Sequence, residues 1–120
     1  MLNNLLLIGL GAFLGAISRF ALINELKKRI QSSIPIPTMI VNISGSFLLG
    51  LLVGLKVYTS IYFIMAVGFL GAYTTFSTLA VEAVTLMREK KNGAFFLYSL
   101  GTFFGGILFC LAGWKLALIL

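Results

Sequence analysis

Glycines and hydroxyl-bearing residues gather in the middle of one long apolar segment. That stretch reads Gly68-Phe69-Leu70-Gly71-Ala72-Tyr73-Thr74-Thr75-Phe76-Ser77-Thr78. Glycine frees the backbone and hydroxyl side chains compete for its hydrogen bonds, so the stretch predicts a break in a helix. A break at membrane depth survives only against protein or beside a polar cavity. We therefore expect an ion or substrate site here. The alternative is a continuous tilted helix whose hydroxyls bond to its own carbonyls.

Three further polar residues lie inside apolar segments. Asn42, with Ser46 one turn later, predicts either a hydrogen bond between helices or a donor that lines an anion path. Arg19 predicts either a side chain that snorkels to the interface or a vestibule that attracts anions. Glu82 could pair with Arg19 or face the interface, and we assign it no catalytic role.

Another set of residues recurs at intervals of four positions. Tyr98, Thr102, Gly106 and Cys110 share one face of a helix. The two hydroxyls predict contacts along a conduit, whereas a packing groove of small residues explains the spacing equally well. The sequence has three acidic residues, no histidine and no nucleophile paired with a base. We therefore predict that the protein is not an enzyme and has no transition-metal site.

Four apolar segments must position these residues. The chain has 120 residues, of which 60% are hydrophobic and 10% are charged. A membrane-spanning helix needs about 20 mostly apolar residues. The expected spans are residues 4–24, 37–55, 61–87 and 94–118. We predict an all-α membrane protein of one domain, 1–120, in the cell membrane, with its third helix broken at its centre.

Pairs of glycines four residues apart occur in three of the expected spans. The pairs are Gly11 and Gly15, Gly50 and Gly54, and Gly101 and Gly105. Such spacing lets two helix backbones approach closely. The pairs predict a tight bundle or an oligomer.

The basic residues are unevenly distributed between the two ends of the expected bundle. The net charge of +6 would suggest nucleic acid in a soluble protein, but here the charges flank apolar segments and serve as topology signals and headgroup contacts. One side carries Lys27, Lys28, Arg29, Arg88, Lys90 and Lys91, and the other carries Lys56 and Lys115. This bias predicts cytoplasmic first and third loops, both termini outside, and one fixed orientation.

Three stretches resemble the Fluc (CrcB) family of fluoride channels. They are Gly11–Phe20 (GAFLGAISRF), Asn42–Gly50 (NISGSFLLG) and Gly68–Thr78 (GFLGAYTTFST). The resemblance implies a passive fluoride-selective channel in the lipid bilayer, built as an antiparallel dimer with two pores. It also implies a structural Na⁺ ion held by the backbone carbonyls of Gly71 and Thr74.

The resemblance further implies roles for individual side chains along the fluoride pathway. The expected pathway residues are Asn42, Phe76, Ser77, Thr78, Tyr98 and Thr102, and Arg19 is expected near a pore entrance. Phe76 would present the positive edge of its ring to the anion. Such a contact favours fluoride without holding it too tightly to leave.

The chain departs from the family pattern at the position three residues after Phe76. A second Phe is usual there, and this chain has Leu79. Gly106 and Cys110 also replace hydroxyls that are usual on the fourth span. With the charge bias, these departures suggest a heterodimer with an oppositely oriented homologous subunit; a homodimer is the alternative. Other functions considered are a four-span drug/cation transporter, for which Glu82 is the one candidate carboxylate, and a non-conducting assembly subunit.

Overall fold

The computed structural model describes residues 2–57 and 59–120, and this part of the chain contains helices and no strands. The elements are α1 (Leu2–Arg29), α2 (Ile36–Gly54), α3 (Ser60–Tyr62), η1 (Phe63–Leu70), α4 (Gly71–Tyr73), α5 (Phe76–Arg88) and α6 (Asn92–Ile119). η1 is a π-helix, and it runs without interruption between α3 and α4. The all-helical prediction is confirmed for the described residues.

Four helical segments are long and apolar enough to cross a membrane. They are Leu2–Arg29, Ile36–Gly54, Ser60–Arg88 and Asn92–Ile119. They confirm the four predicted spans. Many large apolar side chains on them remain exposed; Phe20, for example, is 69% exposed. Exposure on this scale suits contact with lipid or with another subunit.

The first helix is longer than the apolar segment that predicts it. We expected the span to end near Asn24, and α1 continues to Arg29. Arg29 Nε donates to Glu25 Oε1 at 3.1 Å, one turn earlier. Basic side chains in the last turn also interact favourably with the negative end of the helix dipole. The charged residues that end the apolar span therefore extend the helix beyond it.

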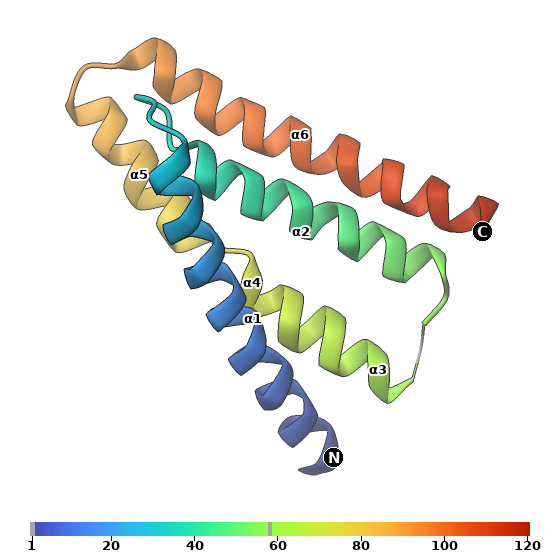
Figure 1. Ribbon diagram of the computed structural model, residues 1–120. Coiled ribbons are helices and arrows are strands. Elements are labelled where there is room, and N and C mark those ends of the chain that lie inside the picture. The colour runs from blue at the N-terminus through green and yellow to red at the C-terminus, as the bar shows by residue number, and fades with distance from the viewer. Residues whose placement is uncertain (1, 58) are drawn as a thin grey trace.

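The helices pack as two pairs (Figure 1). α2 lies along α6 over most of its length, and α1 lies against η1 and α4. The third span divides between the two pairs: its first half packs on α1, and its second half, α5, packs against α6. The connections after α1 and after α5 lie at one end of the molecule, so the two basic clusters share that end. The N-terminus, the connection after α2 and the C-terminus lie toward the other end.

The glycine pairs form the contacts between these helices. A Cβ added to Gly50 would overlap the carbonyl oxygen of Cys110 on α6. A Cβ added to Gly11 or Gly15 would likewise overlap a carbonyl of the facing π-helix. A Cβ added to Gly54 would overlap the backbone of α6. Gly101 and Gly105 face the side chains of Met39 and Ile43 on α2. The predicted close packing is therefore confirmed, and it occurs within one chain.

Two helix ends use lysine where glycine is usual. Lys56 and Lys90 have φ angles of 57° and 60°, in the left-handed region. Lys90 N–H bonds to the Met87 carbonyl and Lys91 N–H to the Leu86 carbonyl, the hydrogen-bond pattern of a Schellman motif. A side chain in this backbone conformation carries strain that glycine avoids.

Candidate functional site

The third span is interrupted by two residues with extended backbone. α4 ends at Tyr73 and α5 begins at Phe76. Thr74 has φ −81° and ψ 157°, and Thr75 has φ −146° and ψ 119°. The interruption falls inside the hydroxyl-rich stretch singled out from the sequence. Its backbone groups consequently need partners outside a regular helix.

Two backbone N–H groups that a continuous helix would use are diverted to side chains. In a regular helix each N–H bonds to the carbonyl four residues earlier. Thr75 N–H instead donates to Asn42 Oδ1 at 2.8 Å. Thr78 N–H donates to Thr75 Oγ1 at 3.2 Å. These diversions leave the carbonyls of Gly71 and Thr74 without their helical donors.

Those two carbonyls are the ones that the resemblance assigns to a cation. Carbonyl oxygens at an unwound helix are suitable ligands for a hard cation such as Na⁺. No group of three or more His, Cys, Asp or Glu side chains is gathered anywhere in the described part of the chain. A cation at the break would therefore be held by neutral oxygens, and the carbonyls of Gly71 and Thr74 are suitable donors for a monovalent ion such as Na⁺.

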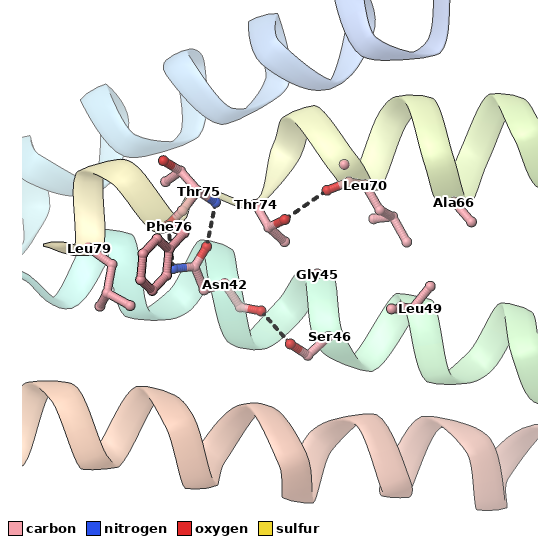
Figure 2. Close-up of a pocket in the computed structure, with 11 residues that line it drawn as sticks. Asn42, Gly45, Ser46, Leu49, Ala66, Leu70, Thr74, Thr75, Phe76 and Leu79 are labelled. Atoms are coloured by element: carbon pink, nitrogen blue, oxygen red, sulfur yellow. Dashed lines mark hydrogen bonds between the residues drawn. The ribbon is translucent and has the colours of Figure 1, made fainter. Parts of the chain in front are cut away.

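Asn42 on α2 is the main contact of the break with a neighbouring helix. Besides accepting from Thr75 N–H, its Nδ2 donates to the Thr75 carbonyl at 3.0 Å (Figure 2). Both polar ends of the amide are thus bonded to one residue. Ser46 Oγ donates to the Asn42 carbonyl at 2.9 Å and does not contact the break. The predicted bond between helices is present, and its partner is backbone.

Arg19 on α1 also contacts the interrupted segment. Its Nη1 donates to the Ala72 carbonyl at 3.0 Å, and the side chain is partly buried. Arg19 does not pair with Glu82, one of the two alternatives considered for that carboxylate. Glu82 Oε1 instead accepts from Thr38 Oγ1 at 2.6 Å, between α5 and α2. The guanidinium therefore satisfies a third carbonyl near the break.

A pocket of about 330 Å³ opens beside the break (Figure 2). It is lined by Asn42, Gly45, Ser46, Leu49, Ala66, Leu70, Gly71, Thr74, Thr75, Phe76 and Leu79. Phe76 is 79% exposed, although it lies at the middle of a membrane span. Gly71, Thr74, Asn42 and Phe76 thus line one open surface. Leu79 lies on the same surface, where the resemblance would place an aromatic ring.

A second pocket, of about 440 Å³, is lined in part by the same α2 residues. Asn42, Ser46 and Leu49 line both pockets, and α6 contributes Thr102 and Gly106 among others to the second. Thr102 Oγ1 donates to the Tyr98 carbonyl of its own helix at 2.7 Å. One face of α2 therefore borders both pockets.

The remaining predicted pathway residues are less closely grouped. Ser77 is exposed next to Phe76, and the Thr78 hydroxyl accepts from Thr75 Oγ1 at 3.1 Å. Tyr98 is fully buried and lines neither of these two pockets. Its hydroxyl has no hydrogen-bond partner among the described residues. A role for Tyr98 on the pathway stays a prediction.

Sequence reasoning missed two residues of the site. Thr75 is the N-cap of α5, and threonine is among the residues favoured at that position. Gly45, one turn after Asn42, is buried against the break, and a Cβ there would overlap the Thr74 methyl group. No local pattern marks Gly45, because the close approach comes from a segment far along the chain.

The break brings two helix ends of opposite polarity together. The carbonyls at the C-terminal end of α4 carry partial negative charge, and the first N–H groups of α5 carry partial positive charge. The same interruption therefore favours a cation on one side and an anion on the other, as half-helices do in membrane transport proteins.

These features define a four-span helical membrane protein whose third span is interrupted beside a pocket. The chain belongs to the CrcB-like protein family (Camphor Resistance, CrcB), whose profile matches residues 6–114. It is therefore a multi-pass protein of the cell membrane.

Its similarity to individual relatives extends over nearly the whole chain. It is 47% identical over 111 residues to "Fluoride-specific ion channel FluC 2" of Bacillus thuringiensis subsp. konkukian (strain 97-27), covering 92% of this chain and 94% of the relative. It is 44% identical over 114 residues to "Fluoride-specific ion channel FluC 1" of Carboxydothermus hydrogenoformans, covering 95% and 93%. It is 39% identical over 122 residues to "Fluoride-specific ion channel FluC 2" of Lactobacillus acidophilus, covering 97% and 98%.

Proposed function

We propose that this chain is a subunit of a fluoride-selective channel that lets fluoride leave the cell passively and so protects it from fluoride toxicity. The observation that carries the proposal is the chain's membership of a family whose relatives bear that name, at up to 47% identity over most of both chains. The interrupted third span supports it, because a helix break at membrane depth is tolerated only where it is buried in protein or lines a water-filled cavity.

Fluoride contacts on this chain would come from Phe76 and the start of α5. The ring edge of Phe76 is the positive part of its quadrupole, and the side chain is exposed. The first N–H groups of α5 add partial positive charge at the same depth. Both attract an anion more weakly than a full positive charge does, so the ion can leave as readily as it enters. Ser77 and Thr78 offer hydroxyls beside them.

Na⁺ would be held by the freed carbonyls of Gly71 and Thr74. When bound, the ion supplies positive charge that balances the carbonyl dipoles at the end of α4. The chain's own contribution is to keep both oxygens out of a regular helix, through the caps on Thr75 and Thr78. Na⁺ is structural in this proposal and is not transported.

The open surface at the break calls for a second subunit. Backbone carbonyls that have lost their helical donors are expensive to leave against lipid. An antiparallel dimer would bring two such surfaces together and complete two pores. Leu79 and the basic bias at one end favour a related, oppositely oriented partner that supplies the missing aromatic ring. The same bias would place both termini of this chain outside the cell. A homodimer is the alternative to such a heterodimer.

The driving force would be the membrane potential. An inside-negative potential favours anion exit by about 2.3 kcal/mol per elementary charge for each 100 mV. No coupling ion is needed, which agrees with the scarcity of acids in the spans. Glu82 would be the carboxylate of a proton-coupled transporter, and it is bonded to Thr38. That alternative function is therefore less well supported.

The test is fluoride efflux from liposomes containing this chain alone or together with a homologue of opposite loop charge. Release is triggered with valinomycin and read with a fluoride electrode, and chloride-loaded liposomes serve as the control. The proposal expects fluoride release without chloride release from at least one of the two preparations. Equal chloride release, or no fluoride release from either preparation, would contradict it. Robust release from the chain alone would favour the homodimer.

A further inference from the structure

We infer that Asn42 is a positioning residue that holds the third span open at Thr75, and that its effect on ion passage comes through the break. The resemblance assigns Asn42 to the fluoride pathway, and the residue type suggests a hydrogen-bond donor there. Its amide is instead occupied at both ends by the backbone of Thr75. The part of this inference that concerns Na⁺ rests on the proposed function.

The geometry of the contact is that of one peptide group bonded to another. Asn42 Oδ1 accepts at 2.8 Å and Nδ2 donates at 3.0 Å, both to Thr75. An amide side chain offers an acceptor and a neutral donor side by side in one plane, as a peptide group does. Aspartate keeps the acceptor and loses the donor, and leucine loses both. Asparagine thus supplies for Thr75 the backbone partners that a regular helix would have supplied.

The capture of Thr75 N–H by Asn42 competes directly with helix continuation. If Thr75 N–H returned to the carbonyl of Gly71, the helix would gain its missing bond and the carbonyl would no longer be free. Asn42 prevents this by taking both backbone groups of Thr75. Arg19, which takes the Ala72 carbonyl from the other side, acts on the next helical bond along the chain.

Gly45 lets the contact form. It lies one turn beyond Asn42, and its missing side chain allows the Thr74 methyl group to rest directly on α2. A Cβ at Gly45 would overlap that methyl group, and threonine has few alternative rotamers with which to move it away. Gly45→Ala should therefore disturb the same break from a position that offers no donor to an ion.

The first measurement concerns the backbone itself. The whole channel, with its partner subunit where one is needed, is isotope-labelled in lipid nanodiscs, and the ¹³Cα and ¹³Cβ shifts of Thr74 and Thr75 are recorded. The wild type should show extended values at both residues. Asn42→Ala and Gly45→Ala should lose those values, becoming helical or averaged, and Asn42→Gln should lie between. Thr85→Ala is the control, because Thr85 is exposed and bonds only to its own helix at Val81.

The second measurement separates positioning from direct contact with the anion. Fluoride efflux is followed against Na⁺ concentration, and so is thermal unfolding of the channel. A positioning role raises the Na⁺ concentration at half-effect by about tenfold for Asn42→Ala in both assays, because two hydrogen bonds that hold the site are lost. Saturating Na⁺ should restore part of the efflux. Thr85→Ala should match the wild type.

The inference is overturned if Thr74 and Thr75 keep their extended shifts in Asn42→Ala and Asn42→Gln. It is equally overturned if Asn42→Ala loses efflux at every Na⁺ concentration while the Na⁺ dependence of unfolding stays unchanged; Asn42 would then contact the anion directly. Should Asn42→Ala not fold, Asn42→Gln and Gly45→Ala carry the same comparison. A wild type that passes no fluoride would refute the proposed function, and the chemical-shift test would still stand.

Discussion

The contact between α2 and α6 and the break in the third span treat backbone polar groups in opposite ways. Along α2 and α6, glycines let two intact helices approach until Gly50 rests on the Cys110 carbonyl and Gly113 on the Phe47 carbonyl. Every backbone bond there stays inside a helix. At the break, Thr75 gives its N–H to a side chain of another helix. In the first region the backbone polar groups are satisfied within their own helices, and in the second they are bonded to side chains.

This difference indicates where the second subunit of the proposed dimer would bind. The α2–α6 contact is filled by its own chain. The break instead leaves Phe76 79% exposed beside a pocket of about 330 Å³. Substitutions in the first region should therefore alter the stability of the subunit. Substitutions in the second should alter ion passage and assembly.

The largest expected effect is a loss of stability from a substitution in the α2–α6 contact. Gly50→Ala places a methyl group against the Cys110 carbonyl, and separating the two helices should destabilise the protein by about 1–3 kcal/mol. Denaturant titration in mixed micelles measures this. Gly9→Ala is the matched control: nothing lies within 4 Å of its Cβ, so the change should stabilise α1 by about 0.5–1 kcal/mol. Equal effects of the two substitutions would refute close backbone packing.

Substitutions at the break should change fluoride efflux and leave the stability of the subunit unchanged. Phe76→Ile removes the ring quadrupole and should lower fluoride efflux about tenfold, the factor that corresponds to 1.4 kcal/mol. Because Phe76 is largely exposed in the subunit, the unfolding of the isolated chain should change little. Flux in liposomes and unfolding in micelles are compared for the same preparation. Unchanged flux would remove Phe76 from the fluoride pathway.

A smaller gain is expected from restoring the missing ring. Leu79→Phe adds an aromatic edge to the pocket that already holds Phe76, and it should raise the fluoride efflux of the lone chain a few-fold, within the roughly 0.5–1.5 kcal/mol typical of aromatic contacts. Leu79→Met, which adds similar bulk and no ring, is the control. If both substitutions change fluoride efflux equally, the effect comes from side-chain volume and not from the ring quadrupole.

The smallest effect is expected outside both regions. Lys90 holds φ at 60° after α5, so Lys90→Gly should stabilise the protein by about 0.5–1 kcal/mol. Lys91→Gly, at φ −93°, should bring no such gain. Thermal unfolding of the two variants decides between backbone strain and the simple loss of a positive charge.

Much of the architecture could be predicted from local patterns. Hydropathy predicts the four spans because each must cross the same apolar layer, and the glycine pairs predict close helix contacts because the spacing lies on one helix face. The interruption was also predictable, since glycines and hydroxyls weaken a helix wherever it packs. These features depend on residues near one another in sequence.

The partners at the break depended on the packing of distant segments. Asn42 meets Thr75 across 33 positions, and Arg19 meets Ala72 across 53. The sequence left Asn42 open between a bond to another helix and a donor to an anion, and it offered Glu82 as a partner for Arg19. Only the folded chain assigns Glu82 to Thr38 and both ends of the Asn42 amide to one residue. Hydrogen bonds between helices require specific distances and angles, and residue spacing along the chain does not encode them.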